Sequence, residues 1–281
     1  MTLPECPEEE IIPDCPESTN LRHHRLRAPA EDGGALVSPP YSCVAPLLAA
    51  NQSQRHTTDC DLLGRSLVEL SSAARHEVID AAVQYTSSYR CVPCGRKQNT
   101  EAVDEPPKII AAGHQPELFH AGVWFKNFVL ADLARIHQAV ALNLVIDTDD
   151  AKPPWINVPG GSLERPLLKQ ISFDDPVAMV MPFEERTILN QERFAQFSEA
   201  VRHHLQPLES EPLLDQFWPV AVERAQATNN LGAALAQSRH ILEESLGLVS
   251  LELPQSQVCE TDSFRGFVGH VFCEAARLAE A

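Results

Sequence analysis

Residues 108–150, KIIAAGHQPELFHAGVWFKNFVLADLARIHQAVALNLVIDTDD, carry the pattern that decides the fold. An apolar run at 109–112 follows two prolines and ends at Gly113, which is typical of a buried strand. Apolar residues then recur every three or four positions over 125–136, which predicts a helix. A second apolar run at 139–146 predicts another strand. The stretch is therefore interpreted as one βαβ unit.

The residues after this unit continue the alternation of helices and strands. Further helices are predicted at 62–89, 191–205, 213–227, 231–246 and from Thr261 onward, and further strands at 168–173, 177–181 and 248–253. The proline- and glycine-rich residues 151–167 are predicted to form a loop. This order is expected of an α/β fold with a mainly parallel sheet flanked by helices, and we assign residues 61–281 to one such domain.

The two ends of the chain differ from this domain. Residues 1–60 are rich in proline and show little periodicity, so we expect an irregular arm that is disordered or loosely docked. The last predicted helix runs to Ala281 without a stop signal, which allows the chain to be the N-terminal part of a longer protein.

The composition narrows the class of partner. The net charge of -17 disfavours nucleic acid, because an acidic surface repels phosphate backbones. The sequence contains no apolar run long enough to span a membrane, and its acidic N-terminus lacks the features of a secretory signal. We therefore expect a cytoplasmic protein whose partner is a small molecule. The oligomeric state is left open.

The eight cysteines do not form a recognisable framework. Cys91 and Cys94 have the spacing of half a zinc knuckle, but a structural zinc site normally needs a second pair, and the sequence has none. The preferred interpretation is a loop with two free thiols. No metal site is predicted.

Polar residues follow both strands of the βαβ unit. His114 and Gln115 come after the first strand, and Asp147, Asp149 and Asp150 come after the second. Ligands of open α/β sheets bind where the carboxyl ends of the strands meet. We therefore predict a site at this edge, with His114 as one catalytic residue and Asp147 and Asp149 as carboxylates that orient an amine or act as base. The three aspartates could instead bind a divalent cation with substrate oxygens, hold a ribose or cap the next turn. Gln115 and Asp150 are assigned to substrate binding.

The start of the predicted helix adds further candidates. Gly113 allows a sharp exit from the first strand, and Gly122 leaves backbone N–H groups free to face an anion. His120 is a second catalytic candidate, although either histidine could instead cap the helix. Lys126 is a candidate phosphate contact or a surface lysine. Trp155, in the predicted loop, is a candidate cover for the ligand.

Two families share parts of this segment. His120-Ala121-Gly122 resembles the first three positions of the HxGH signature of nucleotidylyltransferases, although Val123 stands at the fourth. The segment also resembles the bacillithiol biosynthesis cysteine-adding enzyme family, mainly over 70–155. The residues that carry this second resemblance are Gly113-His114-Gln115, Leu118-Phe119, Gly122, Lys126 and the acidic residues 147–150. It implies a Rossmann-like core related to the nucleotidylyltransferases.

Three functions follow as alternatives. The first is a ligase or transferase acting on a small polar metabolite, as the cysteine-adding family implies. The second is an HxGH-type nucleotidylyltransferase, which would use a nucleotide with Mg2+ as its cofactor. The third is a non-catalytic module that binds a ligand or a partner. The sequence has neither a P-loop nor a GxGxxG motif, so those nucleotide-binding classes are not predicted.

Overall fold

A computed structural model describes residues 27, 29–58, 60–92, 107–162, 164–206, 208–209 and 211–275. The chain divides into two compact units, Met1–Val44 and Ala45–Ala281. The first described helix, α1 (Tyr41–Thr57), lies where an irregular arm was expected. Most of its apolar side chains are exposed and form no continuous stripe, so periodicity gave no signal for it. The sheet and the candidate site described below belong to the second unit.

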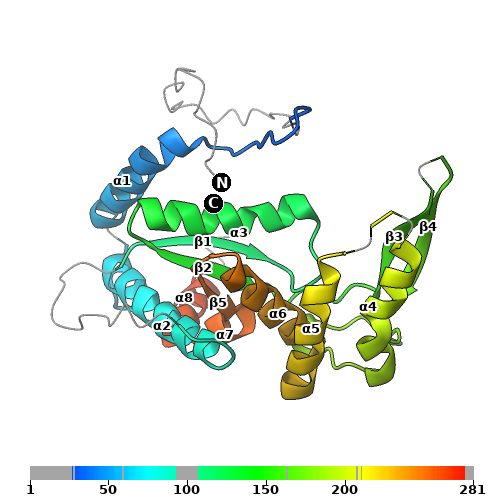
Figure 1. The fold of residues 1–281 in the computed structure, drawn as a ribbon. Coiled ribbons are helices and arrows are strands. Elements are labelled where there is room, and N and C mark those ends of the chain that lie inside the picture. The colour runs from blue at the N-terminus through cyan, green and yellow to red at the C-terminus, as the bar shows by residue number, and fades with distance from the viewer. Residues whose placement is uncertain are drawn as a thin grey trace. The chain divides into compact units, whose positions relative to one another are not determined.

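A three-stranded parallel sheet forms the centre of the second unit, as predicted (Figure 1). Its order is β1 (Ile109–His114), β2 (Val140–Val145) and β5 (Leu251–Pro254). His114 pairs with Val145, and Val145 pairs with Pro254. All three strands therefore end at the same edge of the sheet.

Helices cover both faces of this sheet. Because successive side chains of a strand point to opposite faces, Ala141 packs with Leu130 and Ala134 of α3 (Ala121–Ile136). Its neighbour Leu142 packs instead with Ala82 of α2 (Leu67–Ser87). The α/β fold class and the βαβ unit are thus confirmed.

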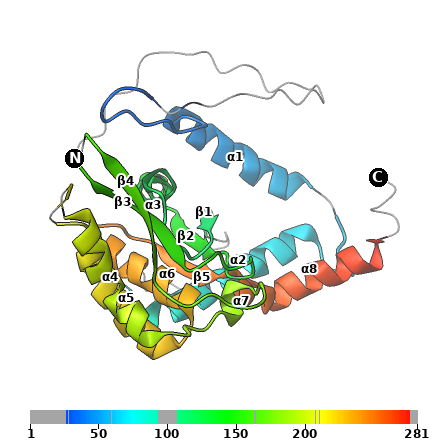
Figure 2. The ribbon, with the colours of Figure 1, turned by 90° about the vertical axis from the view of Figure 1, so that its right-hand side faces the viewer.

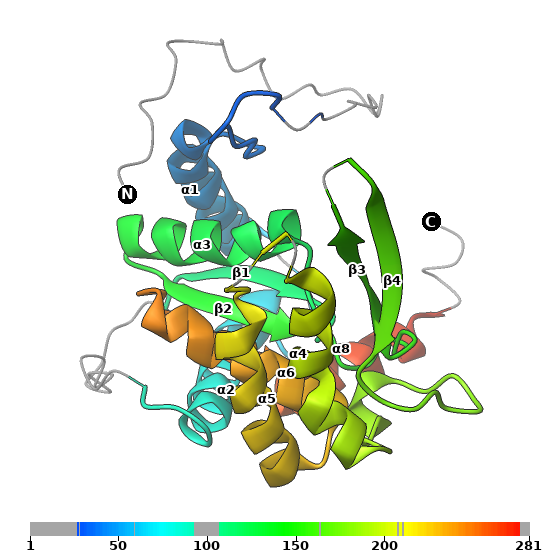
Figure 3. The same ribbon diagram turned by 45° about the vertical axis from the view of Figure 1, so that its right-hand side comes forward.

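The predicted loop at 151–167 is wrong in its main part. Residues Trp155–Gly161 form β3, which pairs antiparallel with β4 (Pro166–Ser172) as a separate two-stranded ribbon (Figure 3). A proline is tolerated in such a ribbon because each of its strands has an unpaired edge. Residues 177–181 form no strand, so the hairpin partner of β4 precedes it in the chain.

The remaining helices pack around Trp218, which is fully buried. They are α4 (Gln191–Leu205), α5 (Leu214–Thr228) and α6 (Leu231–Ser245), seen together in Figure 2. The ribbon closes this second core through Val158 and Ile171. Gly247, with a φ of 85°, follows the end of α6 as the sequence predicted.

Short elements complete the unit. They are the 3-10 helix η2 (Phe183–Glu185), α7 (Gln255–Cys259) and α8 (Asp262–Cys273). Thr261 caps α8 through its side chain, which confirms the predicted helix start. None of the helices in the described ranges combines the length and apolar character needed to cross a bilayer.

Candidate functional site

The loops that follow β1 and β2 meet at the carboxyl edge of the sheet. The side-chain amide of Gln115 donates a hydrogen bond to Asp149 Oδ2 at 2.6 Å, and Lys152 Nζ lies 2.8 Å from Glu117 Oε1. The hydrogen bond from Gln115, together with the backbone amide of Asp150, lowers the pKa of the Asp149 carboxyl. Asp149 is thus held as an exposed carboxylate beside the β1 loop.

His114 is the last residue of β1 and is half-buried. Its Nδ1 lies 3.2 Å from the carbonyl oxygen of Gln115, which can only accept a hydrogen bond. Nδ1 therefore carries the proton in the neutral ring, and Nε2 is left as the acceptor. The imidazole also packs edge-to-face with Phe119, with ring centroids 4.8 Å apart. This packing fixes the ring plane.

His120 caps α3. Its Nδ1 accepts a hydrogen bond of 3.1 Å from the backbone N–H of Gly122. One of the amides that was predicted to face an anion is therefore used within the loop. His120 and Gly122 thus form the cap of α3, which the sequence analysis gave as the alternative to a contact with the ligand.

Gly113 and Lys126 tie the second turn of α3 to the end of β1. Lys126 Nζ donates to the carbonyl oxygen of Gly113 at 3.2 Å. A Cβ at Gly113 would lie 3.2 Å from the carbonyl oxygen of Leu144 on the neighbouring strand. The close approach of β2 is thus sufficient reason for a glycine at this position.

Asp147 joins the end of β2 to α7. Its two side-chain oxygens accept from the backbone N–H of Ser256 at 2.9 Å and from Ser256 Oγ at 2.5 Å. Asp147 is 9% exposed. These contacts assign Asp147 a bridging role between two strand ends and not a direct contact with His114.

The other predicted residues lie further along the chain. Asp150 forms an isolated β-bridge with Pro182, and its N–H donates to Asp149. Trp155 opens β3 opposite Ser172 and is 38% exposed, so it belongs to the ribbon and not to a loop. Cys91 is exposed, and Cys94 lies outside the described residues.

A hollow of about 360 Å3 lies beside Asp147. Its lining comes from the loop after β2, from η2 and from α7 with the residue that follows it: Thr148, Glu184, Ser256, Gln257, Cys259 and Glu260. These lining residues were not selected from the sequence. Ser256 could have been selected, because it follows the third parallel strand just as Asp147 follows the second. A second hollow of about 380 Å3 lies between β4 and α4, where no parallel strand ends. We take the first as the site because the strand ends converge there.

The lining is acidic. Among the residues of this hollow, two are carboxylates and none is a lysine or arginine, although Glu260 is paired with Arg265. Within the described ranges, no group of three or more His, Cys, Asp and Glu side chains is placed to hold a metal ion. The hollow is therefore suited to a neutral or cationic group.

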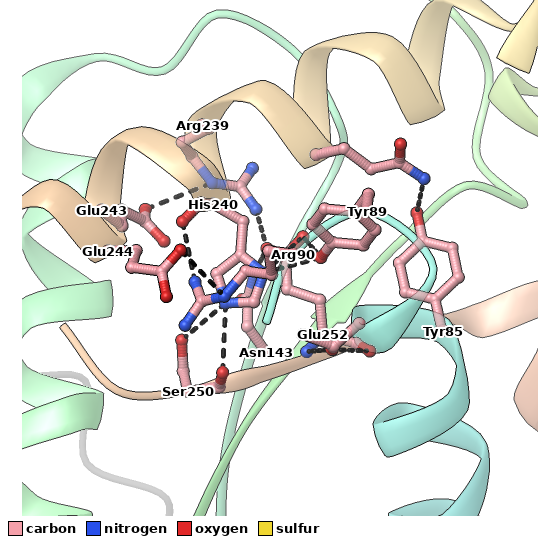
Figure 4. A network of polar contacts seen from close by, with 12 residues as sticks. Tyr85, Tyr89, Arg90, Asn143, Arg239, His240, Glu243, Glu244, Ser250 and Glu252 are labelled. Atoms are coloured by element: carbon pink, nitrogen blue, oxygen red, sulfur yellow. Dashed lines mark hydrogen bonds and ion pairs between the residues drawn. The ribbon is translucent and has the colours of Figure 1, made fainter. Parts of the chain in front are cut away.

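A buried polar network joins β2, β5, α6 and the segment that follows α2 (Figure 4). Glu252 of β5 is fully buried and pairs with Arg239 of α6, while Asn143 of β2 donates to it at 2.6 Å. Glu243 of α6 lies 3.2 Å from Arg239 Nε. Sequence reasoning assigned no role to these side chains.

Burial sets the ionisation of this network. It raises the pKa of Glu252 and lowers the pKa of His240 to about 3. His240 Nε2 lies 3.2 Å from the carbonyl oxygen of Ser250, so Nε2 carries the proton of the neutral ring. Its Nδ1 then accepts from the Tyr89 hydroxyl at 2.6 Å.

No protein-family model matches this chain, and a comparison with curated proteins also finds no match.

Proposed function

We propose that this protein is a ligase or transferase that acts on a small polar metabolite carrying an amine. The observation that carries the proposal is the acidic hollow at the carboxyl edge of the parallel sheet, next to the joined loops of Gln115 and Asp149. The resemblance of residues 70–155 to the bacillithiol biosynthesis cysteine-adding enzymes supports the same class of substrate.

The charges around the hollow support a cationic group over a phosphate. Glu184 and Glu260 line it, and Asp149 is kept ionised beside it. Two nearby lysines are already engaged by protein oxygens: Lys126 of α3 by Gly113, and Lys152 of the loop after β2 by Glu117. A triphosphate would meet repulsion from these carboxylates, and the described residues that line the hollow include no lysine or arginine to offset it.

Each group then has a chemical role. The carboxylate of Asp149 orients the amine, and Nε2 of His114 accepts or returns a proton at the reacting centre. We place this reaction in the cytoplasm. Cys43, Cys60 and Cys259 are free thiols, and a reducing compartment keeps thiols in that form.

A ligand panel tests the proposal. Thermal shifts would be measured with amino-sugar conjugates, ATP and CTP, each with and without Mg2+. We expect stabilisation by an amine-bearing compound that does not depend on Mg2+, since bound ligand raises the melting temperature by mass action. Stabilisation by a nucleotide only with Mg2+ would instead indicate nucleotidyl transfer. If no compound shifts the melting temperature, the result would contradict the proposal and favour a non-catalytic module.

Matched variants locate the binding site. Glu184→Gln and Asp149→Asn remove one charge each at the proposed site, and we expect each to weaken binding of the amine roughly tenfold or more, as for charge-assisted hydrogen bonds. Glu192→Gln removes an exposed charge at the second hollow and serves as the control. Equal effects of all three variants would contradict the assignment.

A further inference from the structure

Arg239 is a buried cation between two carboxylates. Its side chain is 8% exposed, its Nη2 pairs with Glu252, and its Nε lies 3.2 Å from Glu243 Oε1. Glu252 of β5 accepts a hydrogen bond from Nη2, whereas Glu243 of α6 lies at ion-pair distance from Nε without hydrogen-bond geometry. Arg239 is therefore held by a hydrogen bond and by charge, from groups that lie outside the candidate site.

The guanidinium leads from this network to the site loop. The Cζ atom of Arg239 lies 4.6 Å from the centroid of the Phe119 ring, which is cation–π distance. Phe119 in turn packs edge-to-face with the imidazole of His114, with an interplanar angle of 65°. Arg239 thus contacts Phe119, and Phe119 contacts His114, the candidate proton carrier.

The same network also holds the far end of this loop. Glu243 Oε1 accepts from Trp124 Nε1 and from Asn127 Nδ2, both at 2.7 Å. Both donors lie in the first two turns of α3, directly after the loop. Through Glu243, α6 fixes the start of α3, and through Arg239 it fixes Phe119.

We infer that Arg239 is a positioning residue, which acts through Phe119 to hold the His114 imidazole in the orientation that the site uses. The consequence for ligand binding rests on the proposed function, whereas the orientation itself does not. A cation that only stabilises the fold would not act on one side chain in particular. Arg239 should change the orientation of the His114 ring, and it should do so through the Phe119 ring.

Nuclear magnetic resonance of the His114 ring tests the inference without any ligand. The His114 ring signals would be assigned with His114→Gln and compared in Phe119→Leu, Phe119→Tyr and Arg239→Lys. We expect Phe119→Leu and Arg239→Lys to move these signals toward those of free imidazole. Phe119→Tyr should retain them, because it keeps the aromatic ring.

Arg224→Lys is the matched control. Arg224 also lies over an aromatic ring of the network, with its Cζ atom 5.9 Å from the centroid of Tyr89, but the Tyr89 ring packs against Tyr85 and His240 and not against His114. We expect this variant to leave the His114 signals unchanged. His114 signals that are unaffected by Phe119→Leu, or moved as much by Arg224→Lys as by Arg239→Lys, would overturn the inference.

Binding of the amino-sugar probe then separates this inference from the proposed function. We expect Phe119→Leu to weaken that binding roughly tenfold, an effect within the usual range of coupling between contacting residues. Phe119→Tyr should bind the probe as the wild type does. If the wild-type protein binds no amine, the proposed function fails, while the ring signals still decide the role of Arg239. If Arg239→Lys does not fold, the two Phe119 variants still test the contact between Phe119 and His114, and its failure overturns the inference.

Discussion

The side-chain amide of Gln115 donates a 2.6 Å hydrogen bond to the carboxylate of Asp149, which lies 34 positions later in the sequence. This bond joins the two loops of the βαβ unit at the edge where the strands end. It is also the largest cause of the lowered pKa of Asp149, ahead of the amide of Asp150 and the charge of Lys152. The geometry of the edge and the ionisation of its carboxylate therefore depend on the same contact.

Replacing Gln115 by Ala should raise the pKa of Asp149 toward its ordinary value. A carboxyl whose pKa is lowered in the folded state stabilises the fold above its unfolded pKa, and this contribution is lost as the pH falls through the folded pKa. The variant should lose the part of that contribution that the Gln115 hydrogen bond supplies. The measurement is a titration of the Asp149 side chain by carbon-detected resonance. An unchanged titration would show that the hydrogen bond does not form in solution.

His240 predicts a pH dependence of stability. Its pKa is lowered to about 3 by burial and is near 6.5 in the unfolded chain. Its contribution is therefore complete above pH 6.5 and declines as the pH falls toward 3, by at most about 1.4 kcal/mol per pH unit. Urea unfolding from pH 7.5 to pH 5 would measure this decline.

The variant His240→Gln isolates this contribution, because glutamine does not titrate. Glu252, whose pKa is raised, contributes with the opposite sign: its stabilisation is present below its unfolded pKa and is lost as the pH rises through the folded pKa. The advantage of the wild type over His240→Gln should shrink as the pH falls below 6.5. A difference that is constant between pH 7.5 and pH 5 would refute the buried neutral state of His240.

The local pattern of apolar residues was sufficient for many of the elements. It predicted the βαβ unit, and it placed the start of α4 at Gln191 and the start of α6 at Leu231. It failed for β3, because Pro159 and the glycines after it are typical of loops, and only pairing with β4 makes that segment a strand. Pairing between strands is a tertiary property that no local pattern contains.

The buried network was not predictable for a different reason. On α6 the side chains of Arg239, His240 and Glu243 have the composition of a solvent-exposed face. They are buried because α3, β5 and the segment that follows α2 supply polar partners to them, such as Tyr89, and most of these partners are distant in sequence. Part of the site was missed likewise, since the wall formed by η2 and α7 depends on how Asp147 binds Ser256.

Replacing His120 by Ala should lower the free energy of unfolding by about 1 kcal/mol, the usual cost of losing a helix N-cap. The variant His120→Asn should retain most of the stability, since asparagine also accepts a hydrogen bond from the helix. His114→Ala provides the comparison, because His114 caps no helix. Urea unfolding of the three variants separates the cap from the site. Wild-type stability in His120→Ala would show that the bond to Gly122 contributes nothing.

The largest stability effect is expected at Arg239. Replacing it by Met would leave Glu252 and Glu243 buried without their cation, which typically costs about 3–5 kcal/mol. Arg265→Met is the matched control: its ion pair with Glu260 is exposed, and exposed pairs contribute about 0–1 kcal/mol. The measurement is urea unfolding at neutral pH for both variants. Because protonation relieves a buried carboxylate, the loss in Arg239→Met should diminish at lower pH, whereas the small loss in Arg265→Met should not follow that course. A loss at Arg239 no greater than that at Arg265 would mean that the network is hydrated in solution and does not hold Phe119.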